Sequence, residues 1–546
     1  MSSSGGDHDH SNDPNIIYGG PLQLDFDRGC RSLGELILKE FSKRLEKVAL
    51  INGVTSVQLS YGGILEQSLA LASYLREMGI APNDVVAIIS ENRFEYPVTV
   101  FALMYLGTTA ALFNPGYSVN ELEHCLKLTK PKVVIVSAQP YLALQKAVKN
   151  IKLASKIIHF DSSDHELTFQ KCLENSNRQL ELGKFVPNAV DIANQVALIV
   201  MSSGTTGLPK GVQITQSNMM TTFSYTRTFL DKIGSTTEDM ISVEVTPWFH
   251  VAGGVTMLNW LINGMRLVFL PKYHPRSYLR CIQQYRPNML NLVPPIAVFL
   301  AKNPMVDHYD LSSVKTIISG AAPLSREVED LIRSRLKITS IRQAYGLSET
   351  TLAILVQMDA ENKPGSVGRV RPGQWVKVVD PDTGRTLGPY QRGELCFKGT
   401  LIMKGYLGLK DAVDKNGWFR TGDVGYYDDE KDFYIVDRLK ELIKYNAYQV
   451  PPAELEAILL SHPKVKDAAV IGVPDERVGE LATAFVVSAE GASVDPLEIV
   501  KFVDGQVSEQ KRLHGGVRLI DEIPKTASGK ILRRTLREIA KRKSKL

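Results

Sequence analysis

The sequence predicts an α/β protein with more than one domain. Three observations support this fold class. Apolar strands alternate with helical segments between residues 60 and 136, which is typical of a parallel sheet covered by helices. The chain has 546 residues, more than one hydrophobic core usually serves. Beyond residue 445 a helical segment and an apolar strand form a smaller α+β pattern.

The elements of the first part follow from the spacing of apolar residues. A helical period that ends at Gly79 is followed by short β-branched runs, each separated from the next by another helical segment. We predict, in order, a helix at 60–78, a strand at 85–90, a helix at 94–106, a strand at 110–113, a helix at 118–128 and a strand at 133–136. Further buried strands are predicted at 196–200, 316–319 and 468–472.

Two segments bear on targeting and membranes. Residues 1–20 begin with a Ser-, Gly-, Asp- and His-rich stretch without an apolar core, so we expect a disordered leader rather than a signal peptide. Residues 96–119 carry no charge and are long enough to span a membrane. However, Gly107 interrupts the run and Asn114-Pro-Gly116 ends it. We therefore expect a buried helix that leads into a buried strand, and no transmembrane segment.

The positive charge is concentrated at the C-terminus. The net charge is +5, but residues 525–546 hold nine Lys or Arg and one Glu, which leaves 55 basic and 58 acidic residues elsewhere. A nucleic-acid-binding domain would carry basic residues on a face of its own, so we expect no nucleic acid partner. The chain ends in Ser544-Lys545-Leu546, which matches the address that the peroxisomal import receptor reads. We therefore expect a peroxisomal location.

A glycine-rich stretch after the strand at 196–200 is suited to a polyphosphate. Glycines free the backbone to direct N–H groups toward one point, hydroxyls add donors, and a lysine adds positive charge. The candidate residues are Ser202, Ser203, Gly204, Thr205, Thr206, Gly207 and Lys210. The stretch is not the P-loop of NTPases, because Pro209 and Gly211 flank the lysine where that pattern needs Gly-Lys-Ser/Thr.

Three later motifs carry groups that suit the rest of a nucleotide. The small residues Gly320, Ala321, Ala322 and Pro323 follow a strand and let a flat ring lie close to the backbone. The next motif reads Gln343, Ala344, Tyr345, Gly346, Leu347, Ser348, Glu349. Its tyrosine can stack on adenine, its serine can hold a phosphate oxygen, and Glu349 suits Mg²⁺ bound to phosphates. Asp423 ends an aromatic run and can accept hydrogen bonds from a ribose diol.

Three other features are ambiguous on chemistry alone. His250 lies beside aromatic residues and before small ones, and such a histidine is more often packed in a core than used as a ligand. The alternating charges of residues 435–444 are compatible with a solvated, salt-bridged helix start. Lys530 follows Gly529, which sets a tight turn, and a solitary lysine there would be a solvated surface residue.

These motifs, in this order, resemble those of the adenylate-forming enzymes, which include acyl-CoA synthetases, peptide-synthetase adenylation domains and beetle luciferases. The resemblance runs from about Ser60 to Ile539. It implies a large domain at 21–437, made of packed α/β sheets with a small β-barrel-like subdomain. It also implies a hinge at 438–444 and a small mobile α+β domain at 445–546, which ends in the basic tail.

The resemblance also implies a role for each motif. Lys530 would be the catalytic lysine that bridges the acyl carboxylate and the α-phosphate. His250 would lie where that carboxylate meets the nucleotide, and Arg438 would reach the nucleotide from the hinge. The 320–323 turn would lie against adenine. After the small domain rotates, Lys444 would serve the second half of the reaction. ATP, Mg²⁺ and CoA are the cofactors implied.

The closest resemblance is to beetle luciferases and their insect acyl-CoA synthetase relatives, and three departures bear on the substrate. Luciferases carry a second histidine where this chain has Phe249, a small hydroxyl residue where it has Leu352, and an arginine where we align Thr222. All three changes remove polar or basic groups. We therefore expect an apolar acyl pocket and a medium- to long-chain fatty acid as the substrate.

Other functions stay open at this point. The chain could be a luciferase or luciferin-adenylating enzyme, or a CoA ligase of the 4-coumarate type. Ala447 replaces a glycine that commonly lets the pantetheine of CoA pass. A nucleotide-binding protein without catalysis is a further alternative. The joint presence of Lys210, Glu349, Asp423, Arg438 and Lys530 argues against it, because a retired site is free to lose such residues.

Overall fold

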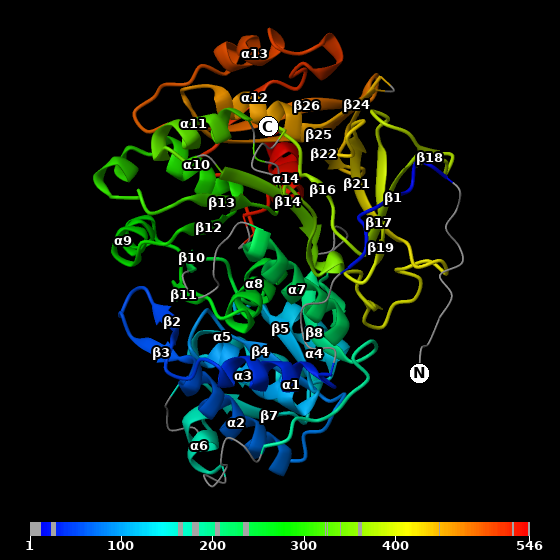
Figure 1. The fold of residues 1–546 in the computed structure, drawn as a ribbon. Coiled ribbons are helices and arrows are strands. Elements are labelled where there is room, and N and C mark those ends of the chain that lie inside the picture. The colour runs from blue at the N-terminus through cyan, green and yellow to red at the C-terminus, as the bar shows by residue number, and fades with distance from the viewer. Residues whose placement is uncertain are drawn as a thin grey trace.

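The computed structural model describes residues 13–22, 29–161, 167–176, 185–202, 208–232, 240–322, 324, 326–338, 340–358, 363–446, 448–526 and 529–543. Figure 1 shows a large body, coloured blue to yellow, and a smaller domain in orange and red that covers one end of it. Four sheets organise the chain: two α/β sheets and an antiparallel sheet in the large body, and a further sheet in the small domain.

The first sheet has seven strands and carries the candidate phosphate loop. Its core strands are parallel, with β4 between β5 and β6, while β9 and β20 run antiparallel at one edge. In sheet order the strands are β20 (Gly405–Tyr406), β9 (Lys210–Thr215), β8 (Val196–Ser202), β5 (Thr109–Phe113), β4 (Val85–Ile89), β6 (Val133–Val136) and β7 (Lys156–His159). The β-branched runs of β4 and β6 are buried on both faces, as parallel strands between helices are.

The second sheet has nine strands and forms the floor of the site described below. Strands β10, β12, β13 and β14 are parallel neighbours, and β15 and β16 extend that edge in antiparallel pairing. In sheet order the strands are β16 (Arg369–Val370), β15 (Leu352–Val356), β14 (Ser340–Leu347), β13 (Thr316–Ser319), β12 (Met289–Leu292), β10 (Ile241–Glu244), β11 (Arg266–Phe269), β2 (Val48–Asn52) and β3 (Gln58–Ser60).

The remaining two sheets are mainly antiparallel. A six-stranded sheet occupies the place of the expected β-barrel-like subdomain: β1 (Ile17–Tyr18), β17 (Gln374–Val379), β19 (Gly393–Gly399), β21 (Phe419–Tyr427) and β22 (Phe433–Arg438), with β18 (Thr386–Leu387) beside β17. The small domain holds β24 (Tyr448–Val450), β23 (Ile443–Tyr445), β26 (Gly479–Ser488) and β25 (Val465–Asp475), with β27 (Val517–Leu519) beside β26.

The helices cover the α/β sheets and the outer face of the small domain. In the large body they are α1 (Leu33–Ser42), α2 (Tyr61–Glu77), α3 (Glu95–Leu106), α4 (Val119–Thr129), α5 (Ala138–Ile151), α6 (Phe169–Glu174), α7 (Gln216–Lys232), α8 (Val251–Ile262), α9 (Pro275–Tyr285), α10 (Pro294–Lys302) and α11 (Arg326–Leu336). In the small domain they are α12 (Pro452–Ser461), α13 (Pro496–Asp504) and α14 (Arg533–Lys543). Short 3₁₀ turns lie at Pro304–His308, Ser348–Thr350 and Glu509–Lys511.

The uncharged segment at 96–119 is a buried helix followed by a buried strand. Helix α3 is buried on nearly its whole surface and ends at Gly107, which adopts a left-handed φ of 66°. The chain then enters β5, and a capping box between Ser118 and Glu121 starts α4. None of the helices in the described ranges combines the length and the hydropathy that crossing a membrane requires.

The charged segment at 435–444 forms strands rather than a helix start. Strand β22 ends at Arg438 and belongs to the sheet of the large body, whereas β23 begins at Ile443 in the sheet of the small domain. The link between the two sheets is therefore residues 439–442, inside the segment predicted as the hinge. Tertiary pairing explains the strand form, because Asp423 of β21 lies opposite Arg438 in the ladder.

The small domain contacts the large body beside α10. Lys302 Nζ, near the end of that helix, donates a hydrogen bond to the carbonyl of Leu460. Gly529 has a left-handed φ of 84°, and a Cβ on it would lie 3.3 Å from Pro295 Cγ at the start of the same helix. In Figure 1 the red helix α14 points from the small domain toward the green centre of the large body. This arrangement brings the turn before α14, which carries Lys530, against the large body.

Candidate active site

The candidate phosphate loop joins two antiparallel strands. Ser202 ends β8 and lies opposite Lys210, the first residue of β9. Residues Ser203, Gly204, Thr205, Thr206 and Gly207, which we predict to hold phosphates, lie outside the described residues. A strand follows this loop, whereas a helix follows the loop of P-loop NTPases, so the two loops differ in structure as well as in sequence.

Tyr406 contacts both Lys210, which follows this loop, and Glu349, the predicted magnesium ligand. Lys210 Nζ lies 4.9 Å from the centre of the Tyr406 ring. The Tyr406 hydroxyl donates to Glu349 Oε1 at 2.8 Å. Strand β20 pairs with β9 and so brings Tyr406 next to Lys210. Sequence analysis missed this residue, because a Gly-Tyr pair almost two hundred residues away has no local feature that points to the site.

The predicted ribose ligand lies in a buried polar cluster. Tyr345 donates to Asp423 Oδ2 at 2.7 Å, and Arg438 Nε lies 3.2 Å from Asp423 Oδ1. Burial raises the pKa of Asp423, and Arg438, Tyr345 and Lys530 oppose that rise. Asp423 Oδ1 forms no hydrogen bond within the described residues. This oxygen therefore has unused hydrogen-bond acceptor capacity.

The predicted adenine turn is held by Gln343. The Gln343 amide donates to Leu324 O and Glu329 Oε1 and accepts from Leu324 N, at 2.6–3.2 Å. Its side chain is thus committed to supporting the turn, and it does not line the cavity described next. Gly320 and Ala321 do line that cavity, and Ala321 has a left-handed φ of 73°. Ala322 is exposed, and Pro323 lies outside the described residues.

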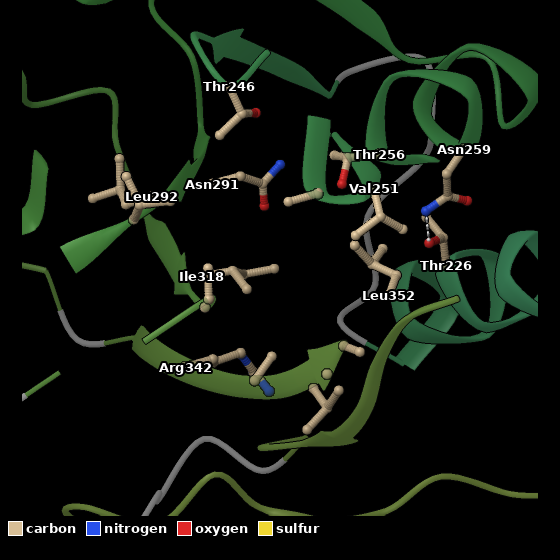
Figure 2. Close-up of a pocket in the computed structure, with 18 of the residues that line it drawn as sticks. Thr226, Thr246, Val251, Thr256, Asn259, Asn291, Leu292, Ile318, Arg342 and Leu352 are labelled. Atoms are coloured by element: carbon tan, nitrogen blue, oxygen red, sulfur yellow. Dashed lines mark hydrogen bonds between the residues drawn. The ribbon is translucent and has the colours of Figure 1, made fainter. Parts of the chain in front are cut away.

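A cavity lies on the face of the nine-stranded sheet and contains several predicted residues. It encloses about 1350 Å³ of non-atom space, including its open mouth. Helices α7 and α8 form one wall, and β15 forms another (Figure 2). The predicted residues that line it are His250, Gly320, Ala321, Ala344, Gly346, Ser348, Leu352 and Lys530. Leu352 has an unusual positive φ of 99°, and such strain is frequent at functional sites.

The cavity floor contains charged groups that the sequence did not predict. The strand register places Glu244, Asn291, Ile318 and Arg342 in one row across β10, β12, β13 and β14. All four line the cavity, as does Arg371, which follows β16. Figure 2 shows Asn291, Ile318 and Arg342 along this floor. The lining of this cavity is mainly apolar but also carries a carboxyl and two guanidinium groups, and the apolar acyl pocket stays a prediction.

His250 and Lys530 both line the cavity and interact electrostatically. His250 is the N-cap of α8, and its Nδ1 accepts from Ala252 N at 3.3 Å, so Nε2 is left to carry the proton of the neutral ring. Burial, followed by the charge of Lys530, lowers the pKa of His250 to about 4. Lys530 is held by a turn in which Thr526 N donates to Lys530 O at 2.8 Å. Burial and Arg438 lower the pKa of Lys530, while Asp423 and Glu349 oppose them.

Three other predicted residues lie elsewhere. Thr222, expected in the acyl pocket, is buried one turn before the cavity wall, where its hydroxyl donates to Asn218 O and Thr351 O. Thr222 is not among the residues that line the cavity, whereas Tyr225 and Thr226 are. Phe249 packs against the main core instead of lining the cavity. The side chain of Lys444 is exposed on β23, outside the cavity.

The buried carboxyl of Glu244 should make stability depend on pH. Burial raises the pKa of Glu244 from 4.5 to about 7. Between pH 4.5 and pH 7 the carboxyl is therefore protonated in the folded state and ionised in the unfolded state. Stability should then fall as pH rises from about 4.5 to 7. Glu244→Gln keeps an oxygen for the hydrogen bonds from Thr246, and should be more stable than wild type by about 3 kcal/mol at pH 8 but equal to it at pH 4. Chemical denaturation at both pH values measures this; an equal difference at both would contradict the prediction.

A profile of known protein families matches most of the chain. The AMP-binding enzyme family matches residues 39–407, and the AMP-binding enzyme C-terminal domain matches residues 454–530. The chain belongs to the AMP-binding enzyme family. Members of this adenylate-forming family use ATP to activate a carboxylic acid, so ATP-dependent acid activation is the general chemistry of this chain.

Relatives within the family carry two kinds of names. A luciferin 4-monooxygenase of Nipponoluciola cruciata is 41% identical, with 97% of this chain and 98% of the relative covered. A probable 4-coumarate–CoA ligase of Dictyostelium discoideum is 36% identical, with 93% and 95% covered. ATP-bound MatB from Rhodopseudomonas palustris has a TM-score of 0.81 and 26% identity over 93% of this chain and 99% of MatB. These similarities confirm the predicted fold of a large N-terminal and a small C-terminal domain.

Proposed function

We propose that this AMP-binding enzyme is a fatty acyl-CoA synthetase, which converts a medium- or long-chain acid to acyl-AMP and then to acyl-CoA, AMP and pyrophosphate. The observation that carries the proposal is the position of Lys530. This lysine comes from the small domain but lines the same cavity as His250 and Ser348 of the large body. This position supports a role for Lys530 in the first half-reaction.

The first half-reaction would use the residues around His250 and Lys530. The acyl carboxylate attacks the α-phosphorus of ATP and pyrophosphate leaves, so catalysis consists mainly of positioning and charge stabilisation. Lys530 would bridge the carboxylate and the α-phosphate. Neutral His250 would donate from Nε2 to the carboxylate without adding a second cation beside Lys530. Lys210 would hold the outer phosphates, and Asp423 the ribose.

The residues present suit a magnesium ion. Mg²⁺ commonly binds one or two carboxylates together with substrate phosphates and water. Glu349 supplies such a carboxylate, oriented by Tyr406 and adjacent to the phosphate loop. The described residues hold no cluster of three or more potential metal ligands, so the remaining ligands would come from ATP and water. Bound in this way, the ion would neutralise charge on the phosphates.

The second half-reaction would need a different arrangement of the domains. The thiolate of CoA attacks the acyl carbonyl and AMP leaves. Lys444 is exposed and outside the cavity here, so it could act at the site only after the small domain rotates about residues 439–442. Ala447, which replaces the glycine expected on the pantetheine path, lies outside the described residues.

The length of the cavity supports an extended acyl chain. His250 caps α8, and Asn259 and Trp260 of the same helix also line the cavity. Nine residues of helix separate His250 from Asn259, which is about 13 Å along the axis. Val251, Leu292 and Ile318 are among the apolar residues that line the cavity (Figure 2). An acyl chain with its carboxylate at His250 would run along them.

A product assay tests this function against its alternatives. The purified chain would be incubated with ATP, Mg²⁺ and CoA, together with fatty acids of increasing length, hydroxycinnamates or luciferin. The proposal predicts acyl-CoA from fatty acids. Thioesters from hydroxycinnamates alone would indicate a 4-coumarate-type ligase, the function named for some relatives. Light from luciferin without acyl-CoA formation would indicate a luciferase, as others are named.

We also propose that the enzyme acts in the peroxisome, after its import receptor binds Ser544-Lys545-Leu546. These residues lie outside the described part of the chain. A chain with a fluorescent protein at its N-terminus should gather in peroxisomes, and removal of the last three residues should disperse it. An unchanged peroxisomal pattern after this deletion would refute the proposal.

A further inference from the structure

Arg371 is a cation inside the acyl cavity that has no anionic partner in the described part of the chain. Its guanidinium lies 4.6 Å from the centre of the Tyr225 ring. It lines the cavity, and no salt bridge to it occurs among the described residues. Arg369, two residues earlier, is exposed and pairs with Glu430 and Asp432. Of these two arginines, Arg371 is therefore the one that lines the cavity and forms no salt bridge among the described residues.

Arg371 is half-buried and lies beside helix α7. Its contact Tyr225 is next to Thr226 on α7, and Asn259 donates to the Thr226 hydroxyl at 2.6 Å. Figure 2 shows this Thr226–Asn259 pair at one end of the site. Because Asn259 is about 13 Å along α8 from His250, Arg371 is remote from the position of the reacting carboxylate. It is therefore placed to contact the far end of an acyl chain.

The other charged groups of the cavity leave Arg371 available. Arg342 donates to the carbonyls of Gln357 and Met358 and lies over the Phe229 ring, so its own position is fixed. Glu244 is at the opposite end of the floor row, three strands from Arg342, which is about 14 Å. Arg371 lies beyond β14, on the far side from Glu244. Glu244 cannot neutralise it.

We propose that Arg371 binds a second carboxylate at the far end of the substrate, so that the preferred substrate is an α,ω-dicarboxylic acid. This inference rests on the proposed acyl-CoA synthetase function and deepens it. Arg371 is half-buried, so its unpaired charge is partly desolvated, and a substrate carboxylate would offset that cost. The planar guanidinium donates two parallel hydrogen bonds to a carboxylate. Burial lowers the pKa of Arg371 to about 10, which keeps it charged at neutral pH.

The test compares acids that differ only at the far end. Medium-chain dicarboxylic acids, their monomethyl esters and monocarboxylic acids of equal length would be assayed for kcat/KM of acyl-CoA formation. In the wild type we expect the diacid to exceed its monomethyl ester by about 10- to 100-fold, the effect of a charge-assisted hydrogen bond. Arg371→Met should bring the ratio near one. Arg369→Met, which removes a surface ion pair two residues before Arg371, should leave the ratio unchanged.

Because the diacid and its monomethyl ester are assayed on the same preparation, a loss of active protein in a variant does not change the ratio of their kcat/KM values. A wild-type enzyme that uses monocarboxylic acids at least as well as diacids would overturn the inference while upholding the proposed function. An unchanged ratio in Arg371→Met would also overturn the inference. A preference for hydroxycinnamates that Arg371→Met abolishes would show that Arg371 binds a phenol oxygen instead. Failure to activate any of these acids would overturn the proposed function itself.

Discussion

Lys530→Ala should abolish acyl-adenylate formation and spare thioester formation from supplied acyl-AMP. Lys530 is the small-domain cation that lines the cavity, and in the proposed mechanism it stabilises the charge that develops on the α-phosphate. Removing one such preorganised donor typically costs about 100- to 1000-fold in rate. In the second half-reaction AMP is already a good leaving group, and Lys530 would be withdrawn. Assaying the two half-reactions separately measures the contrast.

Arg534→Ala is the matched control for Lys530→Ala. Arg534 lies four residues further on, is largely exposed, and pairs only with Glu538 of its own helix among the described residues. Both half-reactions should keep wild-type rates in this variant, because an exposed pair of this kind contributes little. An equal loss of both half-reactions in Lys530→Ala would contradict the role assigned to Lys530.

Asp423→Ala should raise the KM for ATP and lower kcat/KM for ATP by about 10- to 100-fold. The variant loses the acceptor for the ribose and leaves the Tyr345 hydroxyl and the Arg438 guanidinium without their partner. Charge-assisted hydrogen bonds of this kind are worth about 1.5–3 kcal/mol each. Initial rates at varied ATP, with acid and CoA saturating, measure the effect.

Two further variants separate ligand binding from folding at this position. Asp423→Asn keeps an oxygen for the Tyr345 hydroxyl and should lose less than the alanine variant. Asp429→Ala removes an exposed carboxylate just after the same strand, which accepts from the Tyr390 hydroxyl, and should leave the KM for ATP unchanged. If Asp423→Ala bound ATP normally, Asp423 would not be the ribose ligand.

The parts that sequence reasoning predicted have local causes. The runs 85–90 and 133–136 form buried strands because several β-branched residues follow one another between turn residues. Lys530 follows a glycine that the turn requires to have a positive φ. The positions of His250, Ser348 and Leu352 in one cavity follow from motifs whose order matches the family.

The parts that it missed depend on long-range pairing. Tyr406 reaches Lys210 only because β20 pairs with β9, and Glu244 joins Arg342 only through the register of four strands. Alignment placed Thr222 where luciferases have an arginine. The Thr222 hydroxyl instead donates to the carbonyl of Asn218, and the residue does not line the cavity. The carboxyl and guanidinium groups of the cavity were not predicted because Glu244, Arg342 and Arg371 lie outside every motif.

Acid-dependent exchange of pyrophosphate into ATP tests the central claim most directly, namely that this cavity activates a carboxylic acid as its adenylate. The assay needs no CoA and no movement of the small domain. With medium- and long-chain monocarboxylic and dicarboxylic acids, the account predicts exchange in the wild type and its loss in Lys530→Ala. Absence of exchange with every acid, including hydroxycinnamates and luciferin, would contradict the claim and point to a nucleotide-binding protein that has lost catalysis.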